Sequence, residues 1–374
     1  DMDDDMAAKP DDMDDDMAAK PDDMDDDMAS LLATVQARDT LVCGVSGAAV
    51  AFSETAPDGS QTGFDVDFCK VVAAAILGDA DKVSYVPLEA AERFTALQTG
   101  DVDLLMRNTT WTQSRDTDLG LDFGPTTYFD GQQLMARVGD GFTADSQVVD
   151  IDGSVVCTNA GTTTEKNIKD AADGAGIEIT LNTYGDFDKV TDDFISRACD
   201  VVTTDGSALV GRKAKQQPED QAWVIFPASP ISKEPLGPVY NQNDSVFADA
   251  VNWAVYATII ADEKGINQAN VGEICAKVKE AEMMADEEGA TEASEDEMSD
   301  TLIDAEVGRL LGGEGELQTA MGLSADAFCN VISQVGNYDE IFTRNLGPVG
   351  LTRAPGSPNA RYTEGGLIYA PPAR

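Results

Sequence analysis

Short apolar runs alternate with amphipathic stretches along the first third of this chain. The apolar runs at 41–45, 83–88 and 102–106 predict strands. Between them, apolar residues at helical spacing predict helices over 64–77 and 92–99. Strands and helices that alternate at this rhythm predict an α/β fold with mostly parallel sheets.

The alternation continues through the middle of the chain. Strands are predicted at three segments: 151–157, 179–181 and 199–205. Helices are predicted to begin at 161–165 and to span 190–197, 246–260, 328–334 and 338–344. A coil rich in Pro and Gly follows residue 347. A chain of 374 residues can bury its core in two lobes.

The segment from Asn108 to Asp116 follows one of the predicted strands and suits the binding of a carboxylate. Backbone amides are free where a strand ends and a helix begins, Thr110 and Thr112 add hydroxyls, and Arg115 supplies a planar pair of donors. The alternative is a capped helix with a surface arginine. Ligands of parallel α/β sheets bind beyond the carboxyl ends of the strands. The segment is therefore expected to share one cleft with residues at other strand ends: Ser46, Glu89 and Ala90.

The charge of the chain excludes several partners. Lys and Arg total 25, Asp and Glu total 69, and the formal net charge is -44. Such a surface repels nucleic acid and anionic lipid, so we expect neither as a partner. Self-repulsion costs little in molar salt, where the Debye length is about 3 Å. We therefore expect a habitat of high salt.

Missing residue types narrow the chemistry further. The chain has no histidine, which excludes Ser-His-Asp and Cys-His catalysis and the commonest zinc ligand. It has no CxxC pair, so we expect no metal and no cofactor, and no apolar run reaches the length of a membrane span. Six widely spaced cysteines predict disulfides and an oxidising compartment. They allow 15 pairings, and buried free thiols are the alternative.

Two acidic stretches lie outside the alternating pattern. Residues 1–30 repeat DMDDDMAAKPD with a period of 11 and contain 14 Asp and two Lys. Their self-repulsion predicts a disordered tether, with a weak cation site as the alternative. Residues 280–300 hold ten acids and no Lys or Arg, which predicts an exposed insertion. Because the chain begins at Asp1 rather than Met, we expect that a signal peptide has been removed.

Several long runs, in this order, resemble one protein family. They are GFDVD at 63–67, RFTALQTGDVD at 93–103, RNTTWTQSRDT at 107–117, AGTTTE at 160–165, CDVVTTD at 199–205, ISKEPLGPV at 231–239, GNYDEIFTRNLG at 336–347 and GGLIYAPPAR at 365–374. Together they resemble the extracytoplasmic solute-binding proteins of amino-acid ABC transporters (solute-binding protein family 3), in particular the general L-amino-acid-binding branch. The resemblance covers nearly everything after residue 31 except the acidic stretch near 283–300.

The resemblance implies the two-lobed periplasmic-binding-protein fold of type II, with two mostly parallel sheets flanked by helices. Two crossing strands would join the lobes near 131–137 and 231–240. Lobe 1 is then expected over 31–133 and 232–374, with the acidic insertion at about 283–300, and lobe 2 over 134–231. Within this fold the cysteines are expected to pair inside single lobes: Cys43 with Cys69, Cys157 with Cys199, and Cys275 with Cys329.

The resemblance also implies a function without enzymatic activity. A monomeric binding protein would capture extracellular L-amino acids between two closing lobes and deliver them to an ABC transporter permease. It would be periplasmic or extracellular, with the N-terminal tether as a candidate surface anchor. The alternatives are a binding protein for small peptides or opines, and an enzyme similar to cyclohexadienyl dehydratase that uses Glu89 as its general acid.

The expected site residues divide between the lobes. Arg115, Thr110 and the Asn108 amide are expected to hold the α-carboxylate from lobe 1. Asp205, at the end of a strand in lobe 2, is expected to bind the ammonium, although a helix N-cap is the alternative reading of this residue. The remaining expected contacts are the Thr162–Thr163 turn, which closes over the ligand, and the selectivity residues Ser46, Phe52, Glu89 and Ala90.

Overall fold

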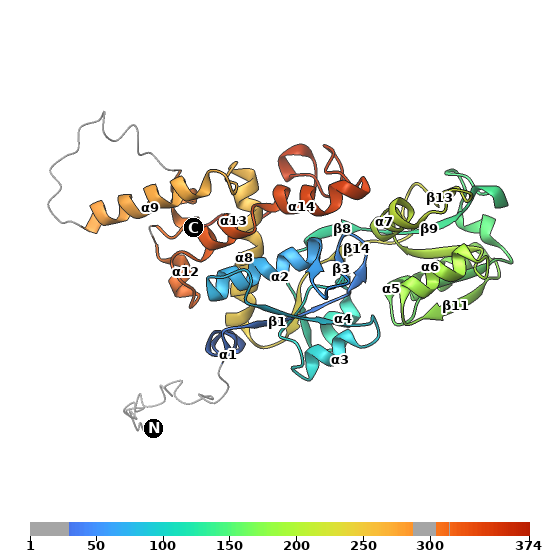
Figure 1. Ribbon diagram of the computed structural model, residues 1–374, viewed down its shortest axis with the longest axis horizontal. Coiled ribbons are helices and arrows are strands. Elements are labelled where there is room, and N and C mark those ends of the chain that lie inside the picture. Colours follow the sequence, from blue (N-terminus) through green and yellow to red (C-terminus); the bar gives the residue numbers. More distant parts are fainter. Residues whose placement is uncertain (1–29, 287–303, 314) are drawn as a thin grey trace, which may run out of the picture.

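The computed structural model of the protein describes residues 30–286, 304–313 and 315–374. These residues form two lobes, each built on a five-stranded sheet, joined by a pair of short crossing strands (Figure 1). This is the predicted type II architecture. The predicted tether, apart from its last residue, and most of the acidic insertion lie outside the described residues.

The lobe 1 sheet has the strand order β5-β1-β6-β15-β7. Its strands β1 and β5 run parallel, as do β1 and β6, whereas β15 is antiparallel to both neighbours. The strands are β1 (Leu41–Val45), β5 (Val83–Pro87), β6 (Leu104–Leu105), β7 (Leu121–Phe123) and β15 (Val239–Asn241). The helices are α1 (Leu31–Arg38), α2 (Phe64–Leu77), α3 (Arg93–Gln98), α4 (Gln113–Asp118) and α8 (Ser245–Glu263). Helix α2 is apolar on nearly all sides because it is buried between the sheet and the C-terminal helices.

The lobe 2 sheet has the strand order β11-β10-β12-β9-β13. Its strands are β9 (Gln132–Arg137), β10 (Val155–Asn159), β11 (Thr180–Tyr184), β12 (Val201–Asp205) and β13 (Trp223–Phe226). Its helices are α5 (Thr163–Ala175), α6 (Phe187–Ile195), α7 (Gly206–Gln216), and the 3-10 turns η1 (Val138–Asp140) and η2 (Val148–Ile151). The prediction of a strand over 151–157 is wrong for the first half of that segment, because η2 and a turn precede β10.

The lobes are joined by β8 (Tyr128–Asp130) and β14 (Glu234–Leu236), which pair antiparallel with Asp130 opposite Glu234. The first crossing strand therefore lies just before the expected segment 131–137, which instead contains the whole of β9. In Figure 1 these two strands lie between the lobes. Their pairing brings two carboxylates to the junction.

The C-terminal helices pack on lobe 1 with α2 and α8. They are α9 (Val271–Asp286), α11 (Ala305–Leu310), α12 (Leu317–Ala320), α13 (Ala327–Gln334) and α14 (Tyr338–Leu346), followed by the 3-10 turns η3 (Gly347–Val349) and η4 (Tyr362–Glu364). The acidic insertion expected from about residue 283 begins inside α9, which continues to Asp286. The tail follows lobe 1 as expected, and Arg353 and Arg361 tie it to the buried Asp262 at 2.9 and 2.5 Å.

A short antiparallel sheet interrupts the loop after β1, where no strand was predicted. It comprises β2 (Ala48–Ala49), β3 (Ser53–Thr55) and β4 (Gln61–Thr62). All six cysteines form disulfides, in the three expected pairs: Cys43–Cys69, Cys157–Cys199 and Cys275–Cys329. None of the described helices combines the length and the apolar composition that a membrane span requires.

Candidate functional site

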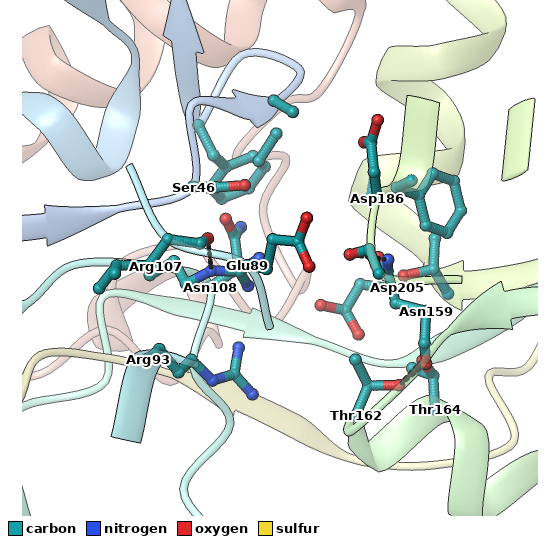
Figure 2. A pocket seen from close by; sticks show the side chains of 18 of the residues that line it. Ser46, Glu89, Arg93, Arg107, Asn108, Asn159, Thr162, Thr164, Asp186 and Asp205 are labelled. Carbon is teal, nitrogen blue, oxygen red and sulfur yellow. Dashed lines mark hydrogen bonds between the residues drawn. The ribbon is translucent and has the colours of Figure 1, made fainter. Parts of the chain in front are cut away.

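A cavity of about 360 Å³ lies between the two lobes, beyond the carboxyl ends of the strands (Figure 2). Eight of the ten predicted ligand-binding residues line it: Ser46, Phe52, Glu89, Asn108, Thr110, Thr162, Thr163 and Asp205. Arg115 and Ala90 are not among its lining residues. The sequence therefore located the cleft, but the arrangement of charges inside it differs from the expected one.

Two hydroxyl groups that were expected to bind the ligand donate instead to a carboxylate of the protein itself. Glu234 is fully buried, and its Oε2 accepts hydrogen bonds from the Thr110 hydroxyl at 2.6 Å and the Thr163 hydroxyl at 2.9 Å. Its Oε1 accepts from the Ser232 hydroxyl at 2.6 Å and from Asn167 Nδ2 at 2.8 Å. The Thr110 and Thr163 hydroxyls are thus directed at the protein's own carboxylate.

Arg115 lies behind the cavity wall and is hydrogen-bonded to Thr110, which lines the cavity. Its Nη1 donates to the backbone oxygen of Thr110 at 2.8 Å, and its guanidinium lies 5.1 Å from the centre of the Phe94 ring. Burial lowers the pKa of Arg115 to about 10, and the charges of Glu234 and Asp205 oppose that shift. The predicted helix does begin here, with the Thr112 hydroxyl as its N-cap.

The Asn108 backbone amide, which was expected to bind the ligand, is engaged within lobe 1 instead. Its backbone N–H donates to Asp65 Oδ2 at 2.8 Å, and the residue adopts a positive φ of 38°. Its side-chain Oδ1 is buried and has no hydrogen-bond partner in the part of the chain that the structure describes. Burial raises the pKa of Asp65 to about 7, opposed by the Asn108 amide and by Arg107. The turn therefore depends on a buried carboxyl group behind the cavity.

Two arginines that sequence reasoning missed line the lobe 1 wall. Arg107 donates through Nε to the Leu88 backbone oxygen at 2.8 Å, and burial lowers its pKa to about 10. Arg93 is only 2% exposed, and its buried Nε has no hydrogen-bond partner within the described ranges. Each of the two is the first residue of a sequence run that resembles the family, and each follows a predicted strand. These two features could have identified both arginines as candidate site residues.

Asp205 is a half-buried carboxyl group on the lobe 2 wall. It stands at the N-cap position of α7 but makes no side-chain capping hydrogen bond, so the capping alternative lacks its defining contact. Burial raises the pKa of Asp205 well above its ordinary value, and Asp130 and Glu234 raise it further, whereas Arg93 and Arg115 lower it. This carboxyl group would gain from a cationic partner in the cleft.

The turn before α5 forms the base of the lobe 2 wall. The Thr162 hydroxyl caps α5 by accepting from the Glu165 amide at 3.1 Å, as the sequence pattern predicts. Gly161 adopts a φ of +72°, and a side chain there would meet the Ala91 backbone of lobe 1 at 3.3 Å. Glycine thus allows the turn to approach the opposite lobe closely.

The two lobes contact each other around the cavity. Arg212 of α7 donates to the Ala48 backbone oxygen at 2.6 Å, and Lys215 pairs with Glu54 at 2.7 Å. No group of three or more His, Cys, Asp or Glu residues in the described ranges is placed to hold a metal ion. The cavity instead has charged groups of both signs on each wall: Arg93 and Arg107 lie with Glu89 and Glu92 on lobe 1, and Asp205 lies with Arg212 on lobe 2. Such a lining suits a small molecule that carries both charges.

Comparison with known proteins gives a consistent set of relatives. A sequence profile of the bacterial extracellular solute-binding proteins, family 3, matches residues 41–265. The chain is 39% identical over 345 residues to the general L-amino acid-binding periplasmic protein AapJ of Rhizobium johnstonii, covering 92% of each. It is 40% identical over 348 residues to the glutamate/glutamine/aspartate/asparagine-binding protein BztA of Rhodobacter capsulatus, covering 92% of this chain and 94% of the relative. A solved ABC transporter/periplasmic binding protein from Brucella ovis with glutathione bound is 38% identical, with a TM-score of 0.79, covering 93% of this chain and 100% of that chain.

Proposed function

Because the chain belongs to family 3 of the bacterial extracellular solute-binding proteins and is a binding protein of amino-acid ABC transport, we propose that it captures L-amino acid zwitterions between its lobes and delivers them to a permease. One observation carries this proposal. Arg93 and Arg107 on lobe 1 face Asp205 on lobe 2 across a single cavity (Figure 2). An amino acid brings the opposite charge to each wall.

The α-carboxylate is assigned to the corner formed by Arg107 and Asn108, with Arg115 behind it. Arg107 lines the cavity, and burial of this corner strengthens its attraction for an anion. The turn at Thr162 and Thr163 approaches from lobe 2 and closes the other side. Backbone amides at the start of α5 add donors on that side.

The ammonium is assigned to Asp205, with Asn108 Oδ1 as a second acceptor. Asp205 makes no helix-capping bond, and the Asn108 side-chain oxygen has no hydrogen-bond partner among the described residues. A buried acceptor without a partner is costly, so a ligand N–H at this position stabilises the complex. Closure of the lobes removes these contacts from water and strengthens them.

Delivery to a permease follows from the class of protein. The relatives named above are binding proteins, and two of them, AapJ and the Brucella ovis protein, are periplasmic. We infer that this chain works as a monomer outside the cytoplasm, with each lobe open to a partner surface. Co-purification with the permease in the presence of ligand would test that step.

A thermal-shift and calorimetric screen against the twenty amino acids tests the proposal. A ligand at 100 times its dissociation constant should add about 2.7 kcal/mol to the stability. Asp205→Asn should weaken binding by at least about 100-fold, because the ammonium loses its buried counterion. Asp170→Asn, on the exposed face of α5, is the matched control and should bind normally. Absence of a shift with every amino acid would contradict the proposal.

Small peptides are the second candidate class of ligand. The Brucella ovis relative, which covers nearly the whole chain, is described with glutathione bound. A γ-glutamyl peptide presents the same α-amino and α-carboxyl groups as an amino acid and extends from the side chain. Titration with reduced glutathione beside glutamate separates the two classes.

A further inference from the structure

Helix α7 of lobe 2 carries a glycine in the middle of its length, at the point where the helix meets lobe 1. Glycine is, after proline, the residue least suited to the interior of a helix. We propose that Gly211 is a positioning residue for ligand capture: the absence of a side chain lets α7 close against Val50 of lobe 1, and the extent of this closure sets the affinity for every ligand. The inference rests on the proposed function, because it concerns how far the lobes close over a ligand.

A side chain at position 211 would collide with lobe 1. A Cβ atom on Gly211 would lie 2.9 Å from Cγ1 of Val50, 3.1 Å from its Cβ and 3.4 Å from its backbone oxygen. The backbone of Gly211 is ordinary helix rather than left-handed, so its conformation does not require glycine. The close approach of Val50 therefore accounts for the glycine.

Val50 is held in place by the turn that carries it. The residue is 5% exposed and lies between β2 and β3. The next residue, Ala51, donates its amide to Glu54 Oε2 at 2.9 Å and accepts from the Phe64 amide at the start of α2 at 2.9 Å. The branched side chain of valine has few rotamers with which to retreat. A larger residue at position 211 would therefore push α7, and lobe 2 with it, away from lobe 1.

Two polar contacts hold the same helix against the small sheet of lobe 1. Arg212 donates to the Ala48 backbone oxygen on β2 at 2.6 Å. Lys215 pairs with Glu54 Oε2 at 2.7 Å, which is the oxygen that also orders the Val50 turn. In Figure 1, α7 lies at the end of lobe 2 nearest to β3. The small sheet that local sequence did not predict is therefore the surface that α7 contacts when the lobes meet.

The contact lies beside the cavity, and Gly211 does not enter it. Val50 and Arg212 are among the lining residues of the cavity, whereas Gly211 is not. Because α7 and the Val50 turn belong to different lobes, the cavity cannot open without separating them. Residue 211 therefore acts on the equilibrium between open and closed lobes rather than on a group of the ligand. A change there should alter the affinity for all ligands by one common factor.

Calorimetric titrations of the full chain with glutamate, leucine and reduced glutathione test the inference. For each compound that binds the parent, Gly211→Ala should weaken binding by about 5-fold and Gly211→Leu by at least about 100-fold, because overpacking a fixed contact grows more costly with size. The ratios between ligands should stay within about 2-fold of the parent values. Gly174 of α5 provides the matched control, because a Cβ there would meet no atom of the described residues within 4 Å. Gly174→Ala and Gly174→Leu should bind normally.

Three further readouts separate incomplete closure from damage to lobe 2. The ligand-saturated Gly211→Leu protein should have a larger radius of gyration in X-ray scattering than the saturated parent. Its melting temperature without ligand should be no lower than that of the parent, because leucine favours the helix and the open lobes leave room for it. In a Val50→Ala background, Gly211→Ala should weaken binding by less than about 2-fold, because the Cγ1 atom that the new Cβ meets is gone.

The outcomes separate this inference from the proposed function. Altered ratios between ligands, or equal losses from the changes at Gly174, would overturn the inference while amino-acid binding stands. A lower melting temperature of unliganded Gly211→Leu would also overturn it, because the glycine would then serve packing within lobe 2. If neither the twenty amino acids nor reduced glutathione bind the parent, the proposed function fails. X-ray scattering without ligand then decides the inference: a larger radius of gyration for Gly211→Leu supports it, and an equal one overturns it.

Discussion

The hydroxyl of Thr163, on the first turn of α5 in lobe 2, donates to the buried carboxylate of Glu234 on crossing strand β14 at 2.9 Å. Thr110 of lobe 1 donates to the same oxygen from the other side. One internal carboxylate thus connects both lobes beside the cavity. Because the bonds from α5 require that helix to lie against the crossing strand, Glu234 stabilises the arrangement in which the lobes are in contact.

Replacing Asn167 by Asp should weaken that contact. The Asn167 amide donates to Glu234 Oε1 at 2.8 Å, and a carboxylate of the same shape would repel it instead. We expect the unliganded Asn167→Asp protein to have a larger radius of gyration in X-ray scattering and to bind every ligand about 10-fold more weakly. Asn182→Asp adds the same charge at an exposed position on β11 and serves as the control. Equal radii of gyration for the parent, Asn167→Asp and Asn182→Asp would contradict this role of Glu234.

Ligand binding should release a proton from the cleft. In the empty protein, burial and the neighbouring Asp130 and Glu234 raise the pKa of Asp205 well above its ordinary value. A ligand ammonium favours the carboxylate form and lowers that pKa again. Affinity should therefore fall as the pH is lowered, because protonation of Asp205 then competes with the ligand. Calorimetry in buffers of different ionisation enthalpy measures the proton, and proton uptake on binding would contradict the assignment.

Most of the fold could be predicted because it depends on local periodicity. Helix α2 and strands β1 and β12 carry long uniform patterns, and their bounds match the expected ones within a few residues. The small sheet of β2, β3 and β4 was missed because its strands are two or three residues long and carry no periodic signal.

The candidate site could be predicted only in part. Local sequence placed Asn108, Thr110, Thr162 and Asp205 at strand ends, and these residues do line the cavity. The partner of the Thr110 hydroxyl lies 124 residues away in the sequence, on a crossing strand whose buried glutamate no local pattern identifies as an acceptor. The available hydroxyls were therefore assigned to the ligand, and the unpaired Arg93 went unnoticed.

Asp65 should make the protein less stable as the pH rises. Its ordinary pKa is 3.8 and its pKa in the folded protein is about 7, so the folded state binds the proton more tightly than the unfolded state. The stability that this neutral carboxyl group contributes is present at low pH and is lost as the pH rises toward about 7. Relative to Asp65→Asn, the parent should lose roughly 3 kcal/mol of unfolding free energy between pH 5 and pH 8. Urea unfolding of the parent and of Asp65→Asn at several pH values measures this loss. A difference in unfolding free energy between the two proteins that does not change with pH would contradict the prediction.

Molar salt should stabilise the protein. The chain carries a formal net charge of -44, and mutual repulsion among surface carboxylates favours the unfolded state at low ionic strength. Added salt shortens the Debye length to about 3 Å at 1 M and reduces that repulsion. We expect the melting temperature to rise between low and molar potassium chloride. Equal melting temperatures would contradict the expectation of a high-salt habitat.

Removal of the lobe 2 disulfide should lower the unfolding free energy by more than removal of a typical surface contact does. Cys157 on β10 is bonded to Cys199, 42 residues later, and the bridge joins β10 to the residues just before β12, across α5, β11 and α6. Loop-closure entropy predicts that Cys157→Ser with Cys199→Ser lowers the unfolding free energy by about 4 kcal/mol.

Because the bridge lies within one lobe, it does not limit movement of the lobes about β8 and β14. Ligand affinity measured well below the melting temperature should therefore stay within about 3-fold of the parent. A large loss of affinity in a variant that is still folded would show that the bridge positions Asp205 directly.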